Sequence, residues 1–225
     1  MRRFLAQVES IGLYPSGQSG LRVATPARDV PRPGQPFLAL QPGKSESTRT
    51  VLYPFELTPH GFLCIAPPDR IWRPGDELDL LGPIGPGFKP PPATRRWLLL
   101  SVDTEAEPLL PLIRLANARG AAISLWASAI PSDLPPDVEV ATDLPASLDW
   151  ADFVAVNATP AGLPELRRLL PLRSDPHIGV RAQTLIVGPM PCGIGGCMAC
   201  AVRARRGWKL ACQDGPVFPL EGLAW

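Results

Sequence analysis

The chain lacks the features that would place it in a membrane or on a nucleic acid. Among its 225 residues, no apolar run approaches the roughly 20 residues that a membrane-spanning helix needs. Its formal net charge of +1 gives no general attraction to anionic polymers or lipid surfaces. The segment Met1–Ala6 has a basic start, but Gln7 and Glu9 interrupt it before the apolar core of a signal peptide can form. We therefore expect a cytoplasmic globular protein with no membrane and no nucleic-acid partner.

Side chains for common catalytic chemistry are also scarce. The chain has only two histidines, His60 and His177, which lie far apart in the sequence and form no suggestive pattern with a carboxylate or a cysteine. No Ser–His–Asp spacing, phosphate loop or paired-histidine metal motif is present. We therefore predict no catalytic residue.

Cysteine is rare as well, but four of the five cysteines are clustered with the spacing C-x4-C-x2-C-x11-C: Cys192, Cys197, Cys200 and Cys212. Disulfides are typical of small secreted domains, which this long chain without a signal peptide does not resemble. Structural zinc usually takes two C-x2-C pairs, and only Cys197 and Cys200 form one here. The spacing is instead that of a plant-type [2Fe–2S] cluster. We predict a [2Fe–2S] cluster held by these four thiolates, with structural zinc as the alternative.

Glycines fill the loop between the first two cysteines, at Gly193, Gly195 and Gly196. A loop that wraps a cluster has to bring backbone N–H groups close to the sulfurs, and it often needs a positive φ angle that glycine adopts without steric cost. The glycines therefore favour the cluster over the zinc site.

The run CGIGGCMAC…GWKLACQDGPVF, residues 192–218, resembles the C-terminal cluster domain of the electron-transfer subunit of heteromeric dihydroorotate dehydrogenases. That family belongs to the ferredoxin–NADP reductase superfamily and serves pyrimidine biosynthesis. The resemblance implies three parts: an FAD-binding β-barrel, a nucleotide-binding α/β domain and the four-cysteine tail. It also implies a hetero-oligomer with a catalytic flavoprotein subunit.

Turn residues and short apolar runs divide the chain in the same way. Several short strands fenced by proline and glycine precede the stiff linker Lys89–Ala93, which is typical of a barrel or sandwich, and the resembling family has a six-stranded barrel. A reduced Rossmann-like α/β domain should follow. We predict an FAD-binding-type barrel at 1–92, a reduced NAD-binding-like domain at 95–182 and a [2Fe–2S] subdomain at 183–225. The expected barrel strands lie at 4–8, 21–24, 37–40, 50–55, 61–66 and 77–81; the later strands lie at 97–102, 121–127, 138–141 and 153–156, with helices near 108–119 and at 163–170.

The family's flavin motif, an arginine-proline-phenylalanine-serine run, corresponds here to Tyr53-Pro54-Phe55-Glu56. Tyrosine replaces the arginine that pairs with pyrophosphate, and a carboxylate replaces the serine. Arg49 could substitute for the arginine only if the register shifts. The glycine-rich exit loop with Gly82 and Gly85 resembles the loop beside the family's flavin. Tyr53, Pro54, Phe55, Gly82 and Gly85 are thus the candidate FAD contacts, and a plain barrel strand is the competing interpretation.

The nucleotide motifs are weaker. The first strand of the α/β domain runs into Ser101–Pro108, which has no glycine and carries three acids where phosphates would bind. Those acids, Asp103, Glu105 and Glu107, suit the cap of a helix. A second family signature corresponds to Asn157–Pro160, of which only the proline matches. We therefore expect no NAD(P)H binding.

A basic run, Arg203, Arg205, Arg206 and Lys209, separates the third and fourth cysteines. It predicts either a solvated hairpin or a surface that attracts an acidic partner and raises the potential of the cluster. We expect an electron-transfer subunit that passes electrons to or from a partner flavoprotein. Two alternatives remain: a complete FAD-containing, NADH-linked reductase subunit with unusual contacts, and a non-catalytic assembly module with a structural four-cysteine metal site.

Overall fold

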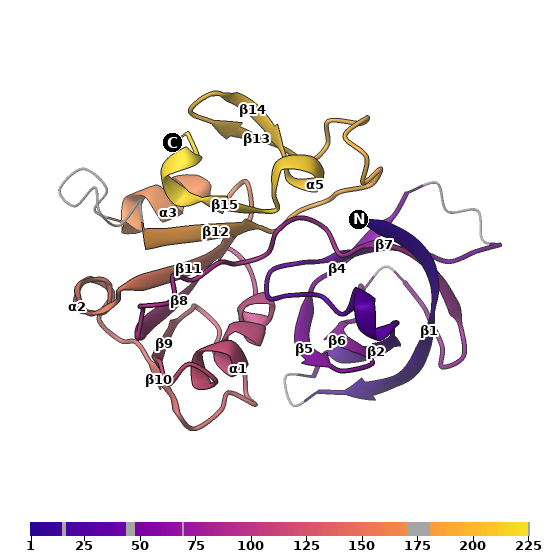
Figure 1. The fold of residues 1–225 in the computed structure, drawn as a ribbon, viewed down its shortest axis with the longest axis horizontal. Helices are drawn as coiled ribbons and strands as arrows, with labels where there is room; N and C mark the ends of the chain where they lie inside the picture. Colours follow the sequence, from indigo (N-terminus) through magenta and orange to yellow (C-terminus); the bar gives the residue numbers. More distant parts are fainter. Residues whose placement is uncertain (15–16, 44–47, 69, 171–180, 225) are drawn as a thin grey trace.

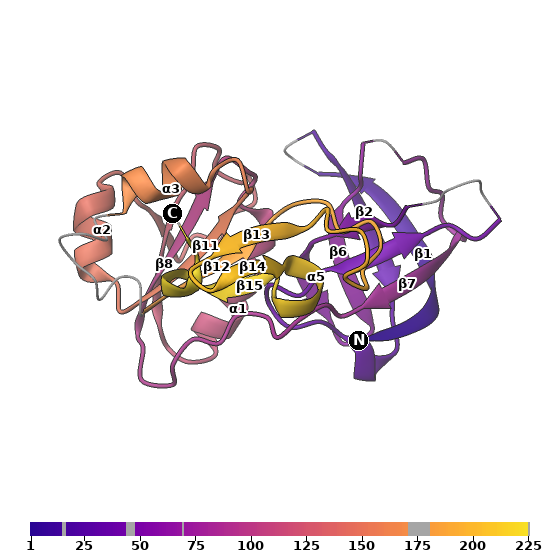
Figure 2. The same cartoon turned by 90° about the horizontal axis from the view of Figure 1, so that it is seen from above.

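The computed structural model describes residues 1–14, 17–43, 48–68, 70–170 and 181–224. An antiparallel barrel and an α/β unit lie side by side, and the C-terminal segment lies across both (Figures 1 and 2). The predicted combination of a β-barrel with an α/β domain is confirmed. Among the described residues, no helix is long and apolar enough to cross a membrane.

The barrel has seven strands in the order β4-β3-β7-β1-β2-β6-β5, not the six that we predicted. The extra strand arises because the predicted strand at 50–55 is divided at Tyr53. Pro54 has no N–H group to donate to a ladder, and the register shifts directly after it. The two halves then pair at opposite edges of the sheet, which almost closes the barrel. The strands are β1 (Arg2–Leu13), β2 (Ser19–Ala24), β3 (Phe37–Leu40), β4 (Thr50–Leu52), β5 (Pro54–Thr58), β6 (Gly61–Ile65) and β7 (Glu77–Gly82), with a 3-10 helix η1 (Ala27–Asp29).

The α/β unit is a six-stranded sheet in the order β10-β9-β8-β11-β12-β15. Its first five strands are parallel, and the apolar run of β8 is buried from Trp97 to Val102 as a central parallel strand requires. The strands are β8 (Arg96–Val102), β9 (Ala122–Trp126), β10 (Val138–Val140), β11 (Phe153–Ala158), β12 (Ala182–Ile186) and β15 (Val217–Pro219). Taken by position in the chain, the order of the parallel strands is 3-2-1-4-5, the order of a Rossmann-type sheet.

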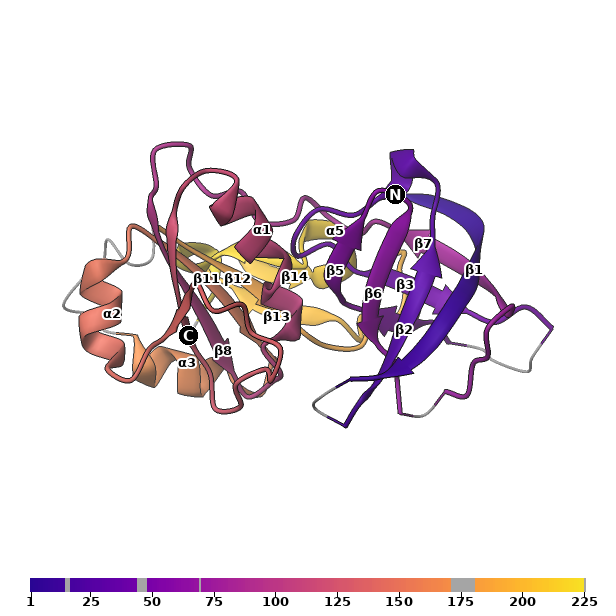
Figure 3. The same ribbon diagram turned by 90° about the horizontal axis from the view of Figure 1, so that it is seen from below.

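Helices cover both faces of this sheet. One face carries η2 (Glu107–Leu109) and α1 (Pro111–Asn117), and the other carries α2 (Leu144–Trp150) and α3 (Leu163–Leu169). Helix α2 was not predicted, although its signal is present: the Asp143 side chain accepts a hydrogen bond from the N–H of Ala146 at 3.1 Å. Helix α1 faces strand β5 of the barrel (Figure 3), and the Arg114 guanidinium donates to the carbonyl of Leu57 at 2.8 Å.

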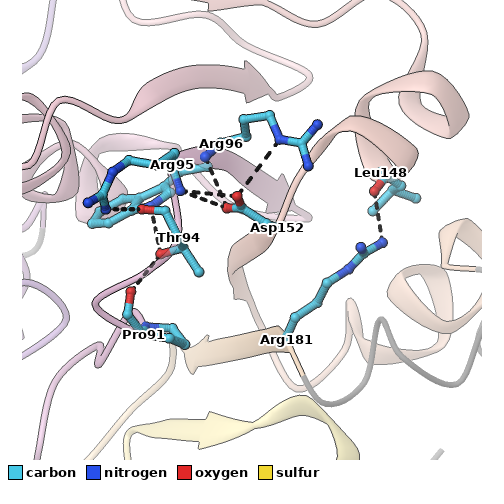
Figure 4. Close-up of polar contacts among 8 residues, drawn as sticks. Pro91, Thr94, Arg95, Arg96, Leu148, Asp152 and Arg181 are labelled. Atoms are coloured by element: carbon cyan, nitrogen blue, oxygen red, sulfur yellow. Dashed lines mark hydrogen bonds and ion pairs between the residues drawn. The ribbon is translucent and has the colours of Figure 1, made fainter.

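The carboxylate of Asp152 holds the start of the central strand β8 beside the start of the neighbouring strand β11. Asp152, directly before β11, accepts hydrogen bonds from the backbone N–H groups of Arg95 and Arg96 at 3.1 and 2.9 Å (Figure 4). The Thr94 hydroxyl donates to the carbonyl of Pro91 at 2.8 Å and turns the linker into the strand. These contacts lie at the amino ends of the strands and leave the opposite, carboxyl edge free for the loops considered below.

The C-terminal segment forms the hairpin β13 (Ala201–Ala204) and β14 (Gly207–Leu210), then α5 (Ala211–Asp214), β15 and the 3-10 helix η3 (Leu220–Gly222). Strand β15 returns to the α/β sheet and pairs antiparallel with β12. The core of this segment includes Leu38 of the barrel and Ile186 of the α/β sheet together with Cys200 and Cys212. The segment with the cysteines is thus packed against both other parts of the molecule.

Candidate metal centre

The hairpin brings the third and fourth cysteines together. Its base is closed by a hydrogen bond from the N–H of Ala211 to the carbonyl of Cys200 at 3.0 Å. As a result the Sγ atoms of Cys200 and Cys212 lie 3.4 Å apart, and both side chains are buried. Two thiolates on one tetrahedral metal ion, each about 2.3 Å from it, would lie about 3.8 Å apart. This pair is therefore close to the spacing that one metal ion requires.

The first two cysteines form a second pair on the loop before the hairpin. Backbone N–H groups of Ile194, Gly196 and Cys197 point at the sulfur of Cys192, which also contacts the Cys197 thiol. The N–H of Ile194 contributes most, and together these hydrogen bonds lower the pKa of Cys192 to about 6. A loop that already stabilises a thiolate is suited to a metal ligand.

Two of the three loop glycines have the conformation that the sequence predicted. Gly193 and Gly195 have φ angles of 68° and 79°. A Cβ atom at Gly193 would also lie 2.5 Å from a methyl carbon of Leu38, so the loop rests directly on the barrel. Gly196 differs, because its φ is not positive and a Cβ there would meet nothing within 4 Å. The loop therefore needs glycine at 193 and 195 but not at 196.

The two pairs differ in exposure. Cys197 is exposed and Cys192 is half-buried, whereas Cys200 and Cys212 are both buried. Burial and the neighbouring Cys200 raise the pKa of Cys212 to about 12, and a hydrogen bond from the N–H of Gly195 partly offsets this increase. Within the part of the chain that the structure describes, no group of three or more histidine, cysteine and acidic side chains surrounds a single metal position. The thiols thus lie in two pairs, each of which could supply two ligands to one metal ion.

Tyr53, the first of the candidate flavin contacts, has a different role in the structure. It lies in the break between β4 and β5, and its hydroxyl donates to the carbonyl of Gly188 at 3.2 Å and accepts from the N–H of the same residue at 3.0 Å. Burial raises the pKa of the Tyr53 hydroxyl. Because Gly188 follows β12, this contact joins the barrel to the α/β sheet just before the cysteine loop.

The other candidate flavin contacts also have partners within the chain. Phe55 is buried and packs edge-on against Tyr14 with ring centroids 4.9 Å apart, beside the buried Pro54. A Cβ atom at Gly82 would lie 2.4 Å from the Phe37 ring, and one at Gly85 would lie 1.8 Å from the carbonyl oxygen of Gly215. The exit loop therefore packs on the barrel interior and on the C-terminal segment.

Arg49, the possible substitute for the missing arginine, is committed to the barrel. Its guanidinium donates to the Asp79 carboxylate at 2.9 Å and to the Asp79 carbonyl at 2.7 Å. Its backbone N–H donates to the carbonyl of Pro191, next to the first cysteine. Arg49 thus supports the cysteine loop and is not free to pair with a pyrophosphate.

The residues present do not fit FAD. Strand β5, which carries most of the motif, contacts η2 and α1 of the α/β unit directly. The motif supplies a tyrosine and the exposed carboxylate of Glu56 where a phosphate would need a cation. We therefore derive no step through a flavin held by this chain.

The carboxyl edge of the parallel sheet does not fit a dinucleotide either. Asp103 follows β8 with a φ of 55°, and its carboxylate accepts a hydrogen bond from the Thr159 hydroxyl after β11 at 2.6 Å. The Thr159 oxygen in turn accepts from the N–H of Gly162 at 3.0 Å. A Cβ atom at Gly162 would lie 2.7 Å from the Cβ of Asp103, so the two loops are in contact where strand order reverses. The chain's own side chains occupy the position at which pyrophosphate binds in such sheets.

The predicted role of the acids as helix caps is wrong. Neither η2 nor α1 has a side-chain cap, because Asp103 bonds to Thr159 instead. Asn157 from the second family signature is fully buried, and its amide donates to the carbonyl of Glu105 at 2.6 Å. Both loops are thus tied to each other by contacts that a single sequence does not reveal.

Comparisons with known proteins match the cysteine-rich segment and the fold. A family model described as the iron–sulfur cluster binding domain of dihydroorotate dehydrogenase B matches residues 189–224. The electron transfer subunit of dihydroorotate dehydrogenase B (NAD(+)) from Desulforamulus reducens is 24% identical over 181 residues, which cover 68% of this chain and 68% of that subunit.

Solved structures extend the likeness to the whole fold. A chain of the NADH-dependent reduced ferredoxin–NADP oxidoreductase, solved to study flavin-based electron bifurcation, has a TM-score of 0.62 at 17% identity and covers 99% of this chain and 90% of its own length. Ferredoxin–NADP+ reductase from Plasmodium falciparum has a TM-score of 0.61 at 8% identity, over 82% of this chain and 96% of that one. At these identities the likeness concerns the fold alone.

The barrel and the Rossmann-type sheet, arranged as they are here, give the protein a ferredoxin reductase-like fold. The four cysteines lie in the segment that matches the iron–sulfur cluster binding domain of dihydroorotate dehydrogenase B, and the chain is similar to an electron transfer subunit of that enzyme. The resemblance inferred from the cysteine-rich segment is thereby confirmed.

Proposed function

We propose that this chain is the electron-transfer subunit of a dihydroorotate dehydrogenase-like complex, and that it carries a [2Fe–2S] cluster as its own redox group. Cys192 and Cys197 would hold one iron, and Cys200 and Cys212 would hold the other. When bound, the cluster accepts and releases one electron at a time. The partner is a catalytic flavoprotein subunit in a hetero-oligomer.

The arrangement of the thiols in two pairs is the observation that carries this proposal. The two thiols of each pair are close enough to bind one metal ion, and the Sγ atoms of Cys200 and Cys212 lie 3.4 Å apart. The N–H groups around Cys192 are the kind of donors that hold cluster sulfurs and tune their potential. A single structural zinc would need all four thiols around one point.

The chain's own residues would then orient and shield the cluster. Two residues of the barrel support the loop: the backbone N–H of Arg49 donates to the carbonyl of Pro191, and the side chain of Leu38 packs against Gly193. The buried side chains of the C-terminal core keep water from the pair Cys200 and Cys212. The barrel and the sheet serve in this proposal as supports, and the division into units at 1–92, 95–182 and 183–225 stays a prediction.

Anaerobic purification followed by iron, sulfide and zinc analysis tests the proposal. We expect a coloured protein with about two iron and two sulfide per chain and an electron paramagnetic resonance signal after reduction by dithionite. A colourless protein with stoichiometric zinc would refute it. Acid extraction with flavin fluorescence should find no FAD in the same cluster-containing sample; stoichiometric FAD would instead support the complete reductase subunit.

A further inference from the structure

The hairpin β13–β14 connects directly to the buried pair of thiols. Ala201 follows Cys200, and Leu210 ends the second strand two residues before Cys212. The hairpin is held in place at its far end, where the N–H of Arg205 donates to the carbonyl of Gly222 and the N–H of Ala224 donates to the carbonyl of Arg203, both at 3.0 Å. Figure 1 shows it projecting from the rest of the molecule. A protein bound to this rigid element would lie next to the thiolates.

Three of the four cations of the hairpin have no ion pair within the described residues. Arg203, Arg205 and Arg206 are exposed and make no side-chain hydrogen bond or ion pair to any described residue. Lys209 differs, since its ammonium group lies 3.0 Å from the carboxylate of Asp214. Three free guanidinium groups on a chain with a net charge of only +1 create a local positive field that the total charge conceals.

An exposed aromatic side chain accompanies these cations. Trp208 is 67% exposed and lies directly opposite Arg203 in the hairpin register, so both side chains are on the same face. They line a cavity of about 400 Å³ together with Pro164 and Arg167 of α3. Tryptophan and arginine are the residues that most often dominate binding energy at protein interfaces.

We propose that the hairpin docks an acidic surface of the redox partner protein through Arg203 and Trp208, which line a cavity with Arg167 of α3, and through Arg205 and Arg206 at its turn. The proposal rests on the proposed function and adds to it the surface and the chemistry of the partner. The free arginines attract and orient the acidic surface, and Trp208 provides the apolar anchor. A membrane or nucleic-acid role is disfavoured, because the apolar groove beside the cations suits a folded protein surface and the acids outnumber the cations in the rest of the chain.

Small inorganic oxidants test the local field without any partner. The holoprotein is reduced with dithionite, and the excess dithionite is removed. Each molecule then passes one electron to hexacyanoferrate(III), which becomes hexacyanoferrate(II), or to hexaammineruthenium(III), which becomes the ruthenium(II) complex. At low ionic strength, Arg205→Glu/Arg206→Glu should slow the reaction with the anion about tenfold and accelerate that with the cation. The matched control, Arg22→Glu/Arg73→Glu on the barrel, should change either rate less than about twofold. Equal effects of the two double variants would overturn the proposal.

Direct binding tests the docking itself. The probe is the catalytic dihydroorotate dehydrogenase flavoprotein of the same organism, with association rates measured by biolayer interferometry against salt concentration. Arg205→Glu/Arg206→Glu should lower the association rate at least about tenfold and flatten its salt dependence, and Trp208→Ala should raise the dissociation rate about tenfold. Wild-type rates for both variants, or binding of phosphatidylserine vesicles in place of the flavoprotein, would refute the proposal.

The two failures can be distinguished. If the proposed function is wrong, the purified protein has no iron, and no electron reaches either oxidant. If only the docking surface is wrong, the iron and sulfide content is normal and the rates ignore the hairpin charges.

Discussion

This fold could hold a redox cofactor at two places, the cysteine loop and the carboxyl edge of the parallel sheet. The two places differ in whether their side chains are available to a ligand or already form hydrogen bonds with each other. In the loop, N–H groups of Ile194 and Gly196 point at the Cys192 sulfur, and the thiols lie near one another. At the sheet edge, Asp103 and Thr159 bond to each other at 2.6 Å. A scaffold can thus keep its architecture while one site retains its ligands and another is filled by the chain itself.

Removal of a buried thiol should produce the largest effect in this comparison. In the proposed cluster, Cys212→Ser would leave one iron with a single cysteine ligand from the chain, so we expect loss of more than about 90% of the visible absorbance and of the bound iron. Cys64→Ser is the control, because Cys64 is buried in the barrel core, away from the loop. Retention of iron by Cys212→Ser, measured by metal analysis, would contradict the ligand assignment.

The next largest effect should come from the loop backbone. Gly193→Ala adds a Cβ atom to a residue with a φ of 68°, and this atom would lie 2.5 Å from a methyl carbon of Leu38. We therefore expect the free energy of unfolding to fall by about 1–3 kcal/mol and the half-life of the cluster in air to shorten severalfold. Gly196→Ala serves as the matched control, since its Cβ would meet nothing within 4 Å. Absorbance decay during air exposure measures both variants. Equal half-lives would mean that the loop does not depend on this close approach to the barrel.

A smaller effect is expected where the barrel meets the sheet. Tyr53→Phe removes the hydroxyl that forms hydrogen bonds with the carbonyl and the N–H of Gly188. We expect the free energy of unfolding to fall by about 1 kcal/mol. Tyr14→Phe is the comparison, because the Tyr14 hydroxyl has no hydrogen-bond partner among the described residues. Denaturant unfolding of the anaerobic holoprotein should show a lower midpoint for the first variant only. Identical midpoints would show that the contact with Gly188 contributes nothing.

NADH should have the smallest effect of all. The sheet edge holds its own acid–hydroxyl pair and lacks a glycine-rich turn, so about 1 mM NADH should neither bind in calorimetry nor bleach the cluster absorbance. Dithionite serves as the positive control for reduction. Rapid bleaching by NADH alone would show that the filled edge still admits a dinucleotide.

Sequence reasoning recovered what depends on local pattern. Alternating apolar residues placed the barrel strands, the buried run at β8 placed the central parallel strand, and the cysteine spacing led to the segment that the family model matches. The glycines at 193 and 195 were understood correctly because a positive φ is a local property.

Contacts between distant parts of the chain could not be predicted in this way. The Tyr53–Gly188 contact spans 135 positions and the Asp103–Thr159 contact spans 56. Strand β15 was missed because its short sequence has no periodic signal and is defined by pairing with β12. The break at Tyr53, which turns six predicted strands into seven, follows from pairing at opposite edges of the sheet rather than from the apolar pattern.

The return of β15 to the sheet has a consequence for the entropy cost of closing the cysteine segment into a loop. Strands β12 and β15 are adjacent and antiparallel, so the whole cysteine segment is an excursion whose two ends are joined by one ladder. Pairing of β12 with β15 brings the two ends of the cysteine segment together, so the ladder offsets part of the entropy cost of closing this loop. Ligands to a metal are therefore not alone in holding the loop closed.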